Sequence, residues 1–411
     1  IWMATLWLTD LYRLRARWTY RRELLDILRA ALLIALAAFS ALFIFHLGDV
    51  SRLFLLELFA AQVVVTMGAR IVIRTTLRVA RAHGYSARFI LIVGTGAPAR
   101  AFAARIERRR DLGLRVIGHL AEGPEAPLEV GPNPVLGRLE DIEAILHARV
   151  VDEVAICLPA TSIGLVEPIA RLCEEEGRIV RIPIDEVAGL TVPGGRLEDF
   201  DGLAVLSLVY GPDRIIGLLV KRAVDVAGAL VGLVVLSPVF VALGTIVLVG
   251  EGAPILFHQA RVGLHGRAFR MVKFRTMVPD AEAQVAELEE LNEVQGQAFK
   301  LTDDPRISRV GRFLRRTSLD ELPQLWNVLS GSMSLVGPRP PLPREVAAYD
   351  LWHRRRLSMK PGITGLWQVS ARREVDFDRW VALDLDYIDR WSLWLDFKIM
   401  LRTIPALLSG R

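Results

Sequence analysis

The sequence contains few cysteines and few lysines. Only Cys157 and Cys173 are present, and their spacing fits neither a disulfide framework nor a zinc site. A reducing, cytosolic setting is therefore favoured. All five lysines lie at or after residue 221, although arginine is abundant everywhere else. Two interpretations stay open. Some of these positions require the compact charge of a lysine ammonium rather than the planar guanidinium of arginine, or the distribution is chance.

The sequence also lacks the signatures of two functional classes. No tyrosine is followed four residues later by a lysine, which argues against an epimerase or dehydratase of the NAD-dependent type. The net charge is +5, yet the chain has no recognition helix and no aromatic-rich RNA-binding platform. Nucleic acid is therefore not an expected partner.

Long apolar runs are present. The chain has 411 residues and a mean hydropathy of +0.35, which is typical of a membrane protein with two or three domains. Residues 27–47 and 53–73 are each long enough to cross a bilayer as a helix, so residues 1–80 are predicted to form a membrane hairpin. Arginines precede and follow this pair, which places both flanks in the cytoplasm. We expect the chain to be truncated at its N-terminus.

Residues 87–205 alternate between strand-like and helix-like segments, which predicts a doubly wound, parallel α/β domain of the Rossmann type. A buried strand at 88–93 is followed by a glycine turn in which Gly94 and Gly96 are candidates for pyrophosphate contact. The turn lacks a clear acidic partner for a ribose. A bound nucleotide and a purely structural or dimerising domain both stay open. The remaining expected strands and helices are 114–119, 151–158 and 178–184, and 139–147 and 163–176.

A third apolar region spans residues 215–250 and is interrupted by Ser237 and Pro238. A proline within a helix removes a hydrogen bond and bends the axis. The segment is either a kinked span or a broken helix that enters and leaves by the same face. A single crossing would place the following domain outside the cell, where nucleotides are scarce. A re-entrant helix is therefore expected if that domain uses a nucleotide.

Residues 251–411 are expected to form a mainly helical catalytic domain that contains the adjacent carboxylates Asp320 and Glu321. Neighbouring side chains cannot share one face of a helix or strand, so the two acids would have different roles. Phosphoryl transfer requires neutralisation of charge, usually with Mg²⁺, and an oriented nucleophile, which a carboxylate provides. A merely solvated acidic pair is the alternative.

Tryptophans in the tail suit either the membrane interface or a protein core. They are Trp380, Trp391 and Trp394.

Five motifs in order resemble the bacterial sugar transferase family, the monotopic polyprenyl-phosphate hexose-1-phosphate transferases. The larger members add transmembrane helices, commonly four, and a Rossmann-like domain. The matching motifs are Ser237-Pro238, Lys273-Phe274-Arg275-Thr276-Met277, Thr317-Ser318-Leu319-Asp320-Glu321-Leu322-Pro323-Gln324, Leu335-Val336-Gly337-Pro338-Arg339-Pro340 and Lys360-Pro361-Gly362-Ile363-Thr364-Gly365.

The resemblance implies a mechanism. Asp320 would attack the sugar-bearing phosphorus of a UDP-hexose and release UMP, and undecaprenyl phosphate would then take the phosphosugar. Glu321 would bind Mg²⁺. The implied phosphate contacts are Lys273, Arg275, Arg306, Arg315, Arg339 and Lys360.

The implied setting is the cytosolic side of the bacterial inner membrane, at the first step of exopolysaccharide, capsule or O-antigen synthesis. The expected hexose is glucose or galactose, and a homodimer is left open.

Two other functions stay open. One is a membrane-bound nucleotide-binding regulatory protein. The other is a glycosyltransferase that releases UDP, for which Asp384-Leu385-Asp386 has the metal-binding Asp-x-Asp form. These two aspartates lie in a helical, tryptophan-rich tail, where a surface or structural role is expected.

Overall fold

The computed structural model contains two compact units, comprising residues 1–142, 153–166 and 180–208, and residues 143–152, 167–179 and 209–411. The expected 87–205 domain is thus divided between the units. The residues that the structure describes are 20–46, 51–82, 88–108, 113–123, 129–183, 196–200, 203–208, 215–279, 281, 283–284, 288, 292, 301, 304–370 and 376–408.

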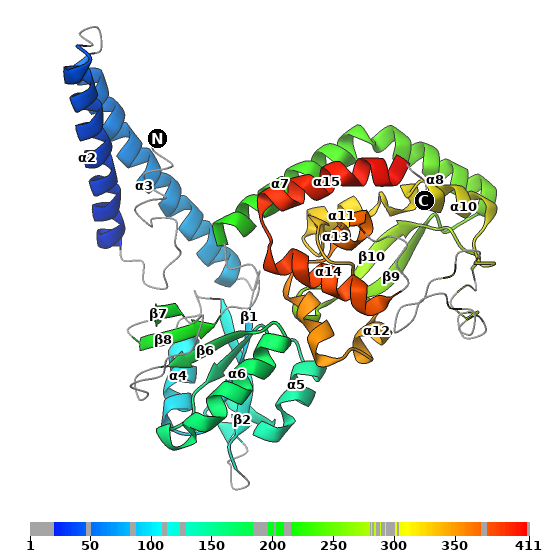
Figure 1. The fold of residues 1–411 in the computed structure, drawn as a ribbon, viewed down its shortest axis with the longest axis horizontal. Helices are drawn as coiled ribbons and strands as arrows, with labels where there is room; N and C mark the ends of the chain where they lie inside the picture. Colours follow the sequence, from blue (N-terminus) through cyan, green and yellow to red (C-terminus); the bar gives the residue numbers. More distant parts are fainter. Residues whose placement is uncertain are drawn as a thin grey trace. The chain divides into compact units, whose positions relative to one another are not determined.

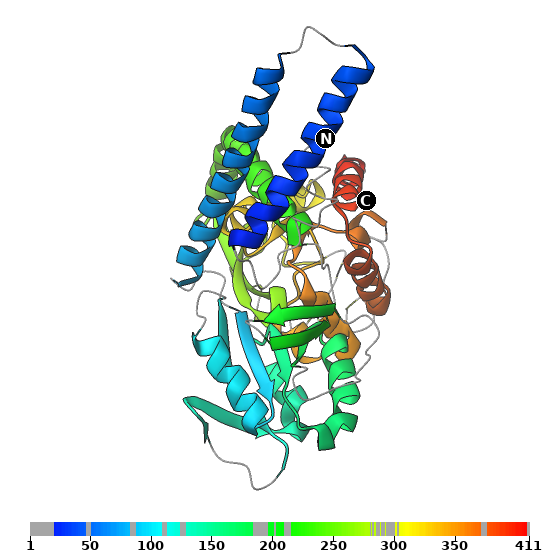
Figure 2. The same cartoon turned by 90° about the vertical axis from the view of Figure 1, so that its left-hand side faces the viewer.

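The first unit begins with two helices, α2 (Tyr20–Ile44) and α3 (Arg52–Ala82), which run antiparallel and side by side (Figures 1 and 2). They contact through a small cluster that includes Ile27 and Met67. Windows at residues 27–44 and 52–69 are long and apolar enough to cross a membrane. The side chains of the flanking arginines used to predict the orientation lie outside the described residues.

An eight-stranded sheet follows, in the order β3-β4-β2-β1-β5-β6-β8-β7. Strand β1 is parallel to β2 and β5, and β2 is parallel to β4. The parallel part of the prediction is confirmed, while the antiparallel pairs β3–β4, β6–β8 and β7–β8 toward the two edges make the whole sheet mixed. The strands are β1 (Arg88–Val93), β2 (Leu114–Ala121), β3 (Glu129–Val130), β4 (Asn133–Arg138), β5 (Glu153–Ile156), β6 (Ile179–Pro183), β7 (Arg196–Phe200) and β8 (Leu203–Leu208).

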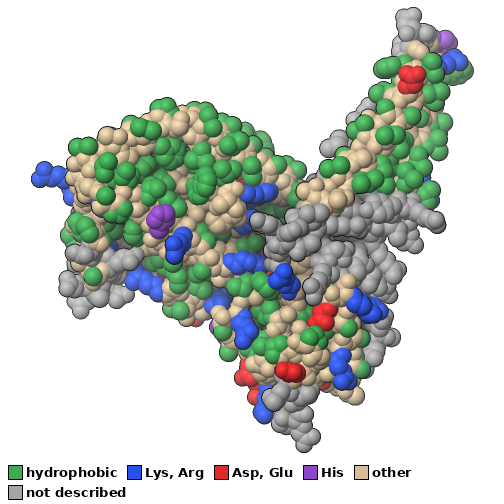
Figure 3. Space-filling model, turned by 180° about the vertical axis from the view of Figure 1, so that it is seen from behind, with side chains coloured by type: hydrophobic (Ala, Val, Ile, Leu, Met, Phe, Trp, Pro, Cys, Tyr) green, Lys and Arg blue, Asp and Glu red, His purple; other side chains and the backbone are tan. Residues whose placement is uncertain are grey.

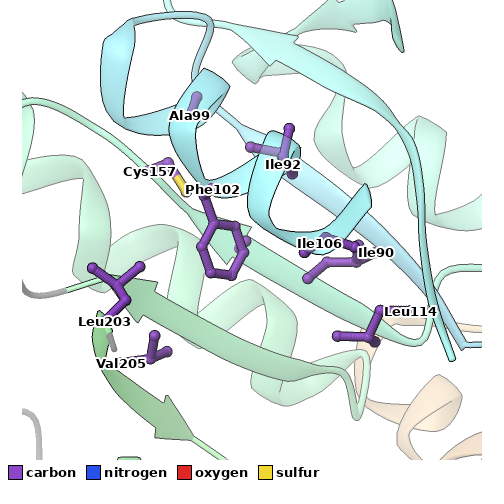
Figure 4. Packing of buried hydrophobic residues seen from close by; sticks show 11 residues of the cluster. Ile90, Ile92, Ala99, Phe102, Ile106, Leu114, Cys157, Leu203 and Val205 are labelled. Atoms are coloured by element: carbon purple, nitrogen blue, oxygen red, sulfur yellow. The ribbon is translucent and has the colours of Figure 1, made fainter. Parts of the chain in front are cut away.

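One face of this sheet packs against α4 (Ala97–Arg108), as Figure 4 shows. Ile90 and Ile92 alternate along β1 and so share a face, and they meet Phe102 and Ile106, which are one helical turn apart. Full burial of each such side chain contributes roughly 1.5–3 kcal/mol. This cluster confirms the predicted strand, turn and helix.

In the second unit the third apolar region forms two helices, α7 (Ile215–Val235) and α8 (Ser237–Glu251), bent by 62° at the break (Figure 1). Pro238 lies in the first turn of α8, and the Ser237 hydroxyl donates to the Val234 carbonyl at 2.7 Å. The predicted break at Ser237 and Pro238 is confirmed. Whether the pair spans or re-enters stays a prediction.

Two glycines set how closely α7 packs. A Cβ at Gly228 would lie 2.8 Å from Leu335 Cδ1, and one at Gly232 would lie 3.0 Å from Leu325 Cδ1. A side chain at either position would force these leucine side chains to shift, so glycine favours the close approach. The α7 helix therefore lies directly on α11 (Gln324–Ser330) and β11 (Ser334–Val336).

The tryptophans of the C-terminal part of the second unit lie in different surroundings. Trp380 and Trp391 are buried, whereas Trp394 is 61% exposed, so core and surface interpretations each hold for part of the set. The remaining elements of the second unit are α5 (Ile142–Ala148), α6 (Val166–Glu175), β9 (Leu256–Val262), β10 (Ala268–Phe274), α10 (Arg309–Arg316), α12 (Pro343–Ala347), β12 (Gly362–Thr364), α13 (Leu366–Ser370), α14 (Phe377–Asp389), α15 (Leu393–Leu408) and the 3₁₀ segments η4 (Leu264–Gly266), η6 (Leu319–Glu321) and η7 (Leu351–Ser358). The first unit also contains the 3₁₀ segments η2 (Leu139–Asp141) and η3 (Ala160–Leu165).

Candidate active site

The acidic pair lies in a tight turn between two helices. Helix α10 ends at Arg316, and Ser318 follows in the left-handed region with φ of 55°. The single 3₁₀ turn η6 then carries both acids, and α11 starts after Pro323. Asp320 points inward and is buried, while the Glu321 side chain is 31% exposed. The predicted divergence of the two side chains is confirmed.

Asp320 is held in a partly desolvated position. The pKa of its carboxyl is raised to about 6, mainly by burial and also by the charge of Glu321. Lys273 and Arg315 act in the opposite direction and favour the carboxylate. Asp320 is therefore a buried acid that still ionises near neutral pH, which is a property expected of a carboxylate nucleophile.

Two cations stand directly beside the acids. Lys273 on β10 places its Nζ 3.1 Å from Oε1 of Glu321. Arg315 on α10 donates from Nε to the Thr276 hydroxyl at 2.9 Å, and Asp320 raises its pKa against the lowering by burial. The structure thus brings Lys273, from one motif, together with Asp320 and Glu321, from another, and with the nearby Arg315. Their roles in catalysis stay predictions.

A second basic group contains Arg339, which is among the predicted phosphate contacts, and Arg261, which was not predicted; the charge of Glu321 acts on Arg261. Arg339 forms a two-pronged ion pair with Glu345, at 3.0 and 3.2 Å. The pKa of Arg261 is lowered to about 10 because Arg261 is buried and lies near the positive charge of Arg339. The charges of Glu345 and Glu321 act on Arg261 in the opposite direction. Arg261 also donates to the Pro340 carbonyl at 2.8 Å. For Arg261, the sequence offers only one signal, the polar run that contains Gln259 and Arg261.

The other predicted phosphate contacts have different surroundings. Arg275 is buried and donates to the carbonyls of Glu251, Gly252 and Ala253 at 2.5, 2.7 and 2.8 Å, so it holds the end of α8. Arg306 is buried in an ion pair with Asp304 at 2.6 Å.

Lys360 is also set apart from the acids. Burial lowers its pKa, and the charges acting on it are Arg222, Asp225 and Arg267. The geometry gives Arg275 and Arg306 anchoring contacts and places Lys360 beside α7.

The glycine turn of the first unit is explained by close packing. Gly94 has φ of 118°, and a Cβ there would lie 2.5 Å from the Cys157 carbonyl oxygen. Its own carbonyl meets His119 Nδ1 at 2.9 Å. These contacts require glycine without any ligand, so nucleotide contact at Gly94 and Gly96 stays a prediction.

The Asp-x-Asp sequence of α14 does not form a pair of metal ligands. Asp384 is buried against Arg356, while Asp386 pairs with Arg390 on the surface at 2.8 Å. The structural role expected for this stretch agrees with its burial.

Within the described residues, no cluster of three or more His, Cys, Asp or Glu side chains that could hold a metal occurs. Mg²⁺ is usually bound by one or two carboxylates together with waters and substrate phosphates. The partly exposed Glu321, beside Asp320, fits that donor set.

Two family models match the chain. Residues 216–410 match "Bacterial sugar transferase", and residues 8–182 match "CoA-binding domain". The first match contains the acidic pair and both basic groups.

Curated relatives extend this result. The UDP-glucose:undecaprenyl-phosphate glucose-1-phosphate transferase of Escherichia coli is 31% identical over 366 residues, which cover 85% of this chain and 75% of that protein. The exopolysaccharide production protein ExoY of Sinorhizobium fredii is 40% identical over 205 residues, which cover 49% of this chain and 91% of ExoY. The galactosyl transferase CpsE of Streptococcus agalactiae is 42% identical over 268 residues, which cover 64% of this chain and 60% of CpsE. The chain belongs to the bacterial sugar transferase family.

Proposed function

We propose that this protein transfers a hexose 1-phosphate from a UDP-hexose to undecaprenyl phosphate, giving undecaprenyl-diphosphate-hexose and UMP. The observation that carries the proposal is the buried Asp320, whose pKa is raised to about 6 and which lies beside Lys273, Arg315 and Glu321. The names of relatives, which include glucose and galactose phosphotransferases acting on undecaprenyl phosphate, support the substrates. The product would start an exopolysaccharide, capsule or O-antigen.

The reaction proceeds in two displacements. A carboxylate oxygen of Asp320 bonds to the sugar-bearing phosphorus, and the bond from that phosphorus to the bridging oxygen breaks, so UMP leaves. A phosphate oxygen of undecaprenyl phosphate then bonds to the same phosphorus, and the Asp320 carboxylate leaves. Asp320 is regenerated in its ionised form.

The surrounding cations stabilise the charge of the diphosphate. Lys273 supplies a compact ammonium group, and Arg315 supplies a planar guanidinium. Arg339 and Arg261 form the second basic group beside Glu321. Positive groups that are already positioned do not have to reorganise during reaction.

The donor set fits Mg²⁺, which Glu321 would hold. When bound, the ion would neutralise part of the negative charge on the diphosphate. Glu321 is already positioned by Lys273, and its exposure leaves it open to the substrate side.

The second unit carries exposed apolar side chains that suit a membrane surface. Apolar side chains on α7 and α8 stay exposed, for example Val235 at 66% and Val249 at 81%, and green side chains gather over this edge in Figure 3. Trp394 and Leu401 add exposed apolar surface on α15. We place α7 and α8 as a re-entrant pair in the inner membrane, with the acids on the cytosolic side where UDP-hexose is found.

The test is covalent labelling. UDP-hexose carrying ³²P in its β-phosphate is expected to label the wild-type protein and to release unlabelled UMP. Asp320→Asn is expected to lose both the label and turnover. The matched control is Asp386→Asn, a surface aspartate of the same second unit, which is expected to label normally. Full activity in Asp320→Asn would refute the assignment.

The product discriminates the alternatives. A glycosyltransferase releases UDP instead of UMP, and a regulatory protein binds nucleotide without releasing either. The described structure favours neither, because Asp384 is buried and the Gly94 turn is explained by packing.

A further inference from the structure

The open edge of strand β10 is occupied by one side chain. Met271 pairs with Gln259 across the β9–β10 hairpin, and backbone groups alternate in direction along a strand. The Arg270 carbonyl and the Val272 amide instead bond to Asn327 of α11, at 2.8 Å and 3.0 Å. The Asn327 amide therefore satisfies the same pair of groups that a neighbouring strand would satisfy.

Asn327 is placed between the two parts of the candidate site. It follows Glu321 by six residues along η6 and α11, and it holds Val272, the residue before Lys273. The ion pair between Lys273 and Glu321, at 3.1 Å, completes a chain of contacts that runs from Asn327 through β10 back to Glu321. A change at Asn327 thus shifts α11 along β10 and moves these two charges relative to each other.

We propose that Asn327 is a positioning residue: its side-chain amide sets the register of α11 on β10 and so holds Lys273 against the Asp320–Glu321 pair. The inference rests on the proposed function. The Asn327 side chain bonds to the backbone of β10 and to the Ser332 hydroxyl. It acts through the strand that carries Lys273.

Helix α11 has other anchors, so loss of the amide displaces it rather than unfolding it. Arg222 donates to the carbonyls of Val328 and Leu329 at 2.6 and 2.9 Å. Leu325 and Val328 remain packed in an apolar cluster with Met271.

The first experiment is a kinetic double-mutant cycle. Asn327→Leu keeps the branched shape of the side chain and removes both hydrogen bonds to β10, together with the one to the Ser332 hydroxyl at 3.3 Å. We expect kcat to fall on the order of 10²-fold, because a misplacement of about 1 Å costs that much, with KM for UDP-hexose changed by less than about threefold. In a Lys273→Met background the same change is expected to lower kcat by less than about threefold. Equal losses in both backgrounds would overturn the proposal, since they would show that Asn327 does not act through Lys273.

Two further variants control for a general disturbance of α11 and for a failure of the leucine variant to fold. Ser330→Ala removes a hydroxyl on the same helix that bonds to the Asn327 carbonyl but leaves the amide contacts intact, and it is expected to retain wild-type kcat. Asn327→Ser retains one hydroxyl and provides the cycle if the leucine variant does not fold. A loss in Ser330→Ala equal to that in Asn327→Leu contradicts the proposal.

A second experiment needs no turnover. Cysteines at Lys273 and Glu321 are bridged with a short bismaleimide, with and without Asn327→Leu. We expect bridging to slow severalfold when the amide is lost. An unchanged rate would overturn the proposed positioning role of Asn327. Failure of the proposed function appears separately, as wild-type protein that releases no UMP.

Discussion

The Asp320 carboxyl shows how one residue combines reactivity with instability. Burial penalises its charge, while Lys273 and Arg315 only partly compensate. The net effect raises the pKa to about 6 from the ordinary value of 3.8. The ionised form needed for attack is therefore the form that the fold tolerates least.

Asp320→Asn is accordingly expected to stabilise the protein at neutral pH. Well below pH 3.8 the acid is protonated in both folded and unfolded chains, so it does not lower the stability of the fold there. As pH rises toward 6 the unfolded chain ionises first, and the wild-type protein loses stability relative to the variant. A shift of about two pKa units corresponds to roughly 3 kcal/mol above pH 6.

Thermal unfolding in detergent across pH 4.5 to 8 measures this effect. The Tm advantage of Asp320→Asn should grow with pH and level off above about 6. A constant difference at all pH values would show that the amide stabilises for another reason. Asp386→Asn, on the surface, is the control.

Single residues also show where sequence reasoning stops. The spacing of Asp320 and Glu321 predicted that they diverge, because neighbouring positions never share a face. The resemblance implies phosphate contacts for Arg275, which lies in one of the matching motifs, and for Arg306. Whether a guanidinium faces a substrate or a backbone carbonyl depends on what lies across from it, and the end of α8 is 22 to 24 residues away from Arg275 in the chain.

At the scale of elements, the broken helix is tied to the second unit by a buried ion pair. Lys221 on α7 donates to Asp396 on α15 at 2.6 Å and to the Val336 carbonyl at 2.9 Å. Asp396 also accepts from Tyr387 at 2.7 Å and from Trp391 at 3.3 Å. This network links the start of α7 to both α14 and α15.

Lys221→Met is expected to destabilise the second unit by about 3–5 kcal/mol, because it leaves the Asp396 carboxylate buried without its cation. Adding Asp396→Leu should recover part of this loss, since no buried charge then remains. Urea or thermal unfolding of detergent-solubilised protein measures both. Lys398→Met is the control, because that ammonium group lies over Trp394 near the surface. A neutral Lys221→Met would mean that Asp396 is protonated in the fold.

Elements differ in how well they could be predicted. The break at Ser237 and Pro238 and the strand at 88–93 follow from local chemistry, and both are found. The antiparallel strands β7 and β8 were not predicted, although Asp201-Gly202 between them is a typical hairpin sequence. The Arg339–Glu345–Arg261 group could not be found from periodicity, because Arg261 is 79 residues from the Pro340 carbonyl that it holds.

For the molecule as a whole, the proposed re-entrant pair makes a topological prediction. A cysteine at the exposed Ser330 is expected to react with a membrane-impermeant maleimide only after inverted vesicles expose the cytosolic side. Labelling from the periplasmic side would show that α7 and α8 cross the membrane. The two native cysteines are buried, and burial raises the pKa of the Cys157 and Cys173 thiols, so the background is low.

The amide that occupies the edge of β10 also bears on biosynthesis. Val272 leaves the ribosome 55 residues before Asn327, so the hairpin exists for several seconds with an uncovered strand edge. Uncovered edges recruit strands from other chains. Nascent chains that stop between Val272 and Asn327 should therefore be the most prone to aggregate. Completion of α11 should cover the edge of β10 and remove this tendency.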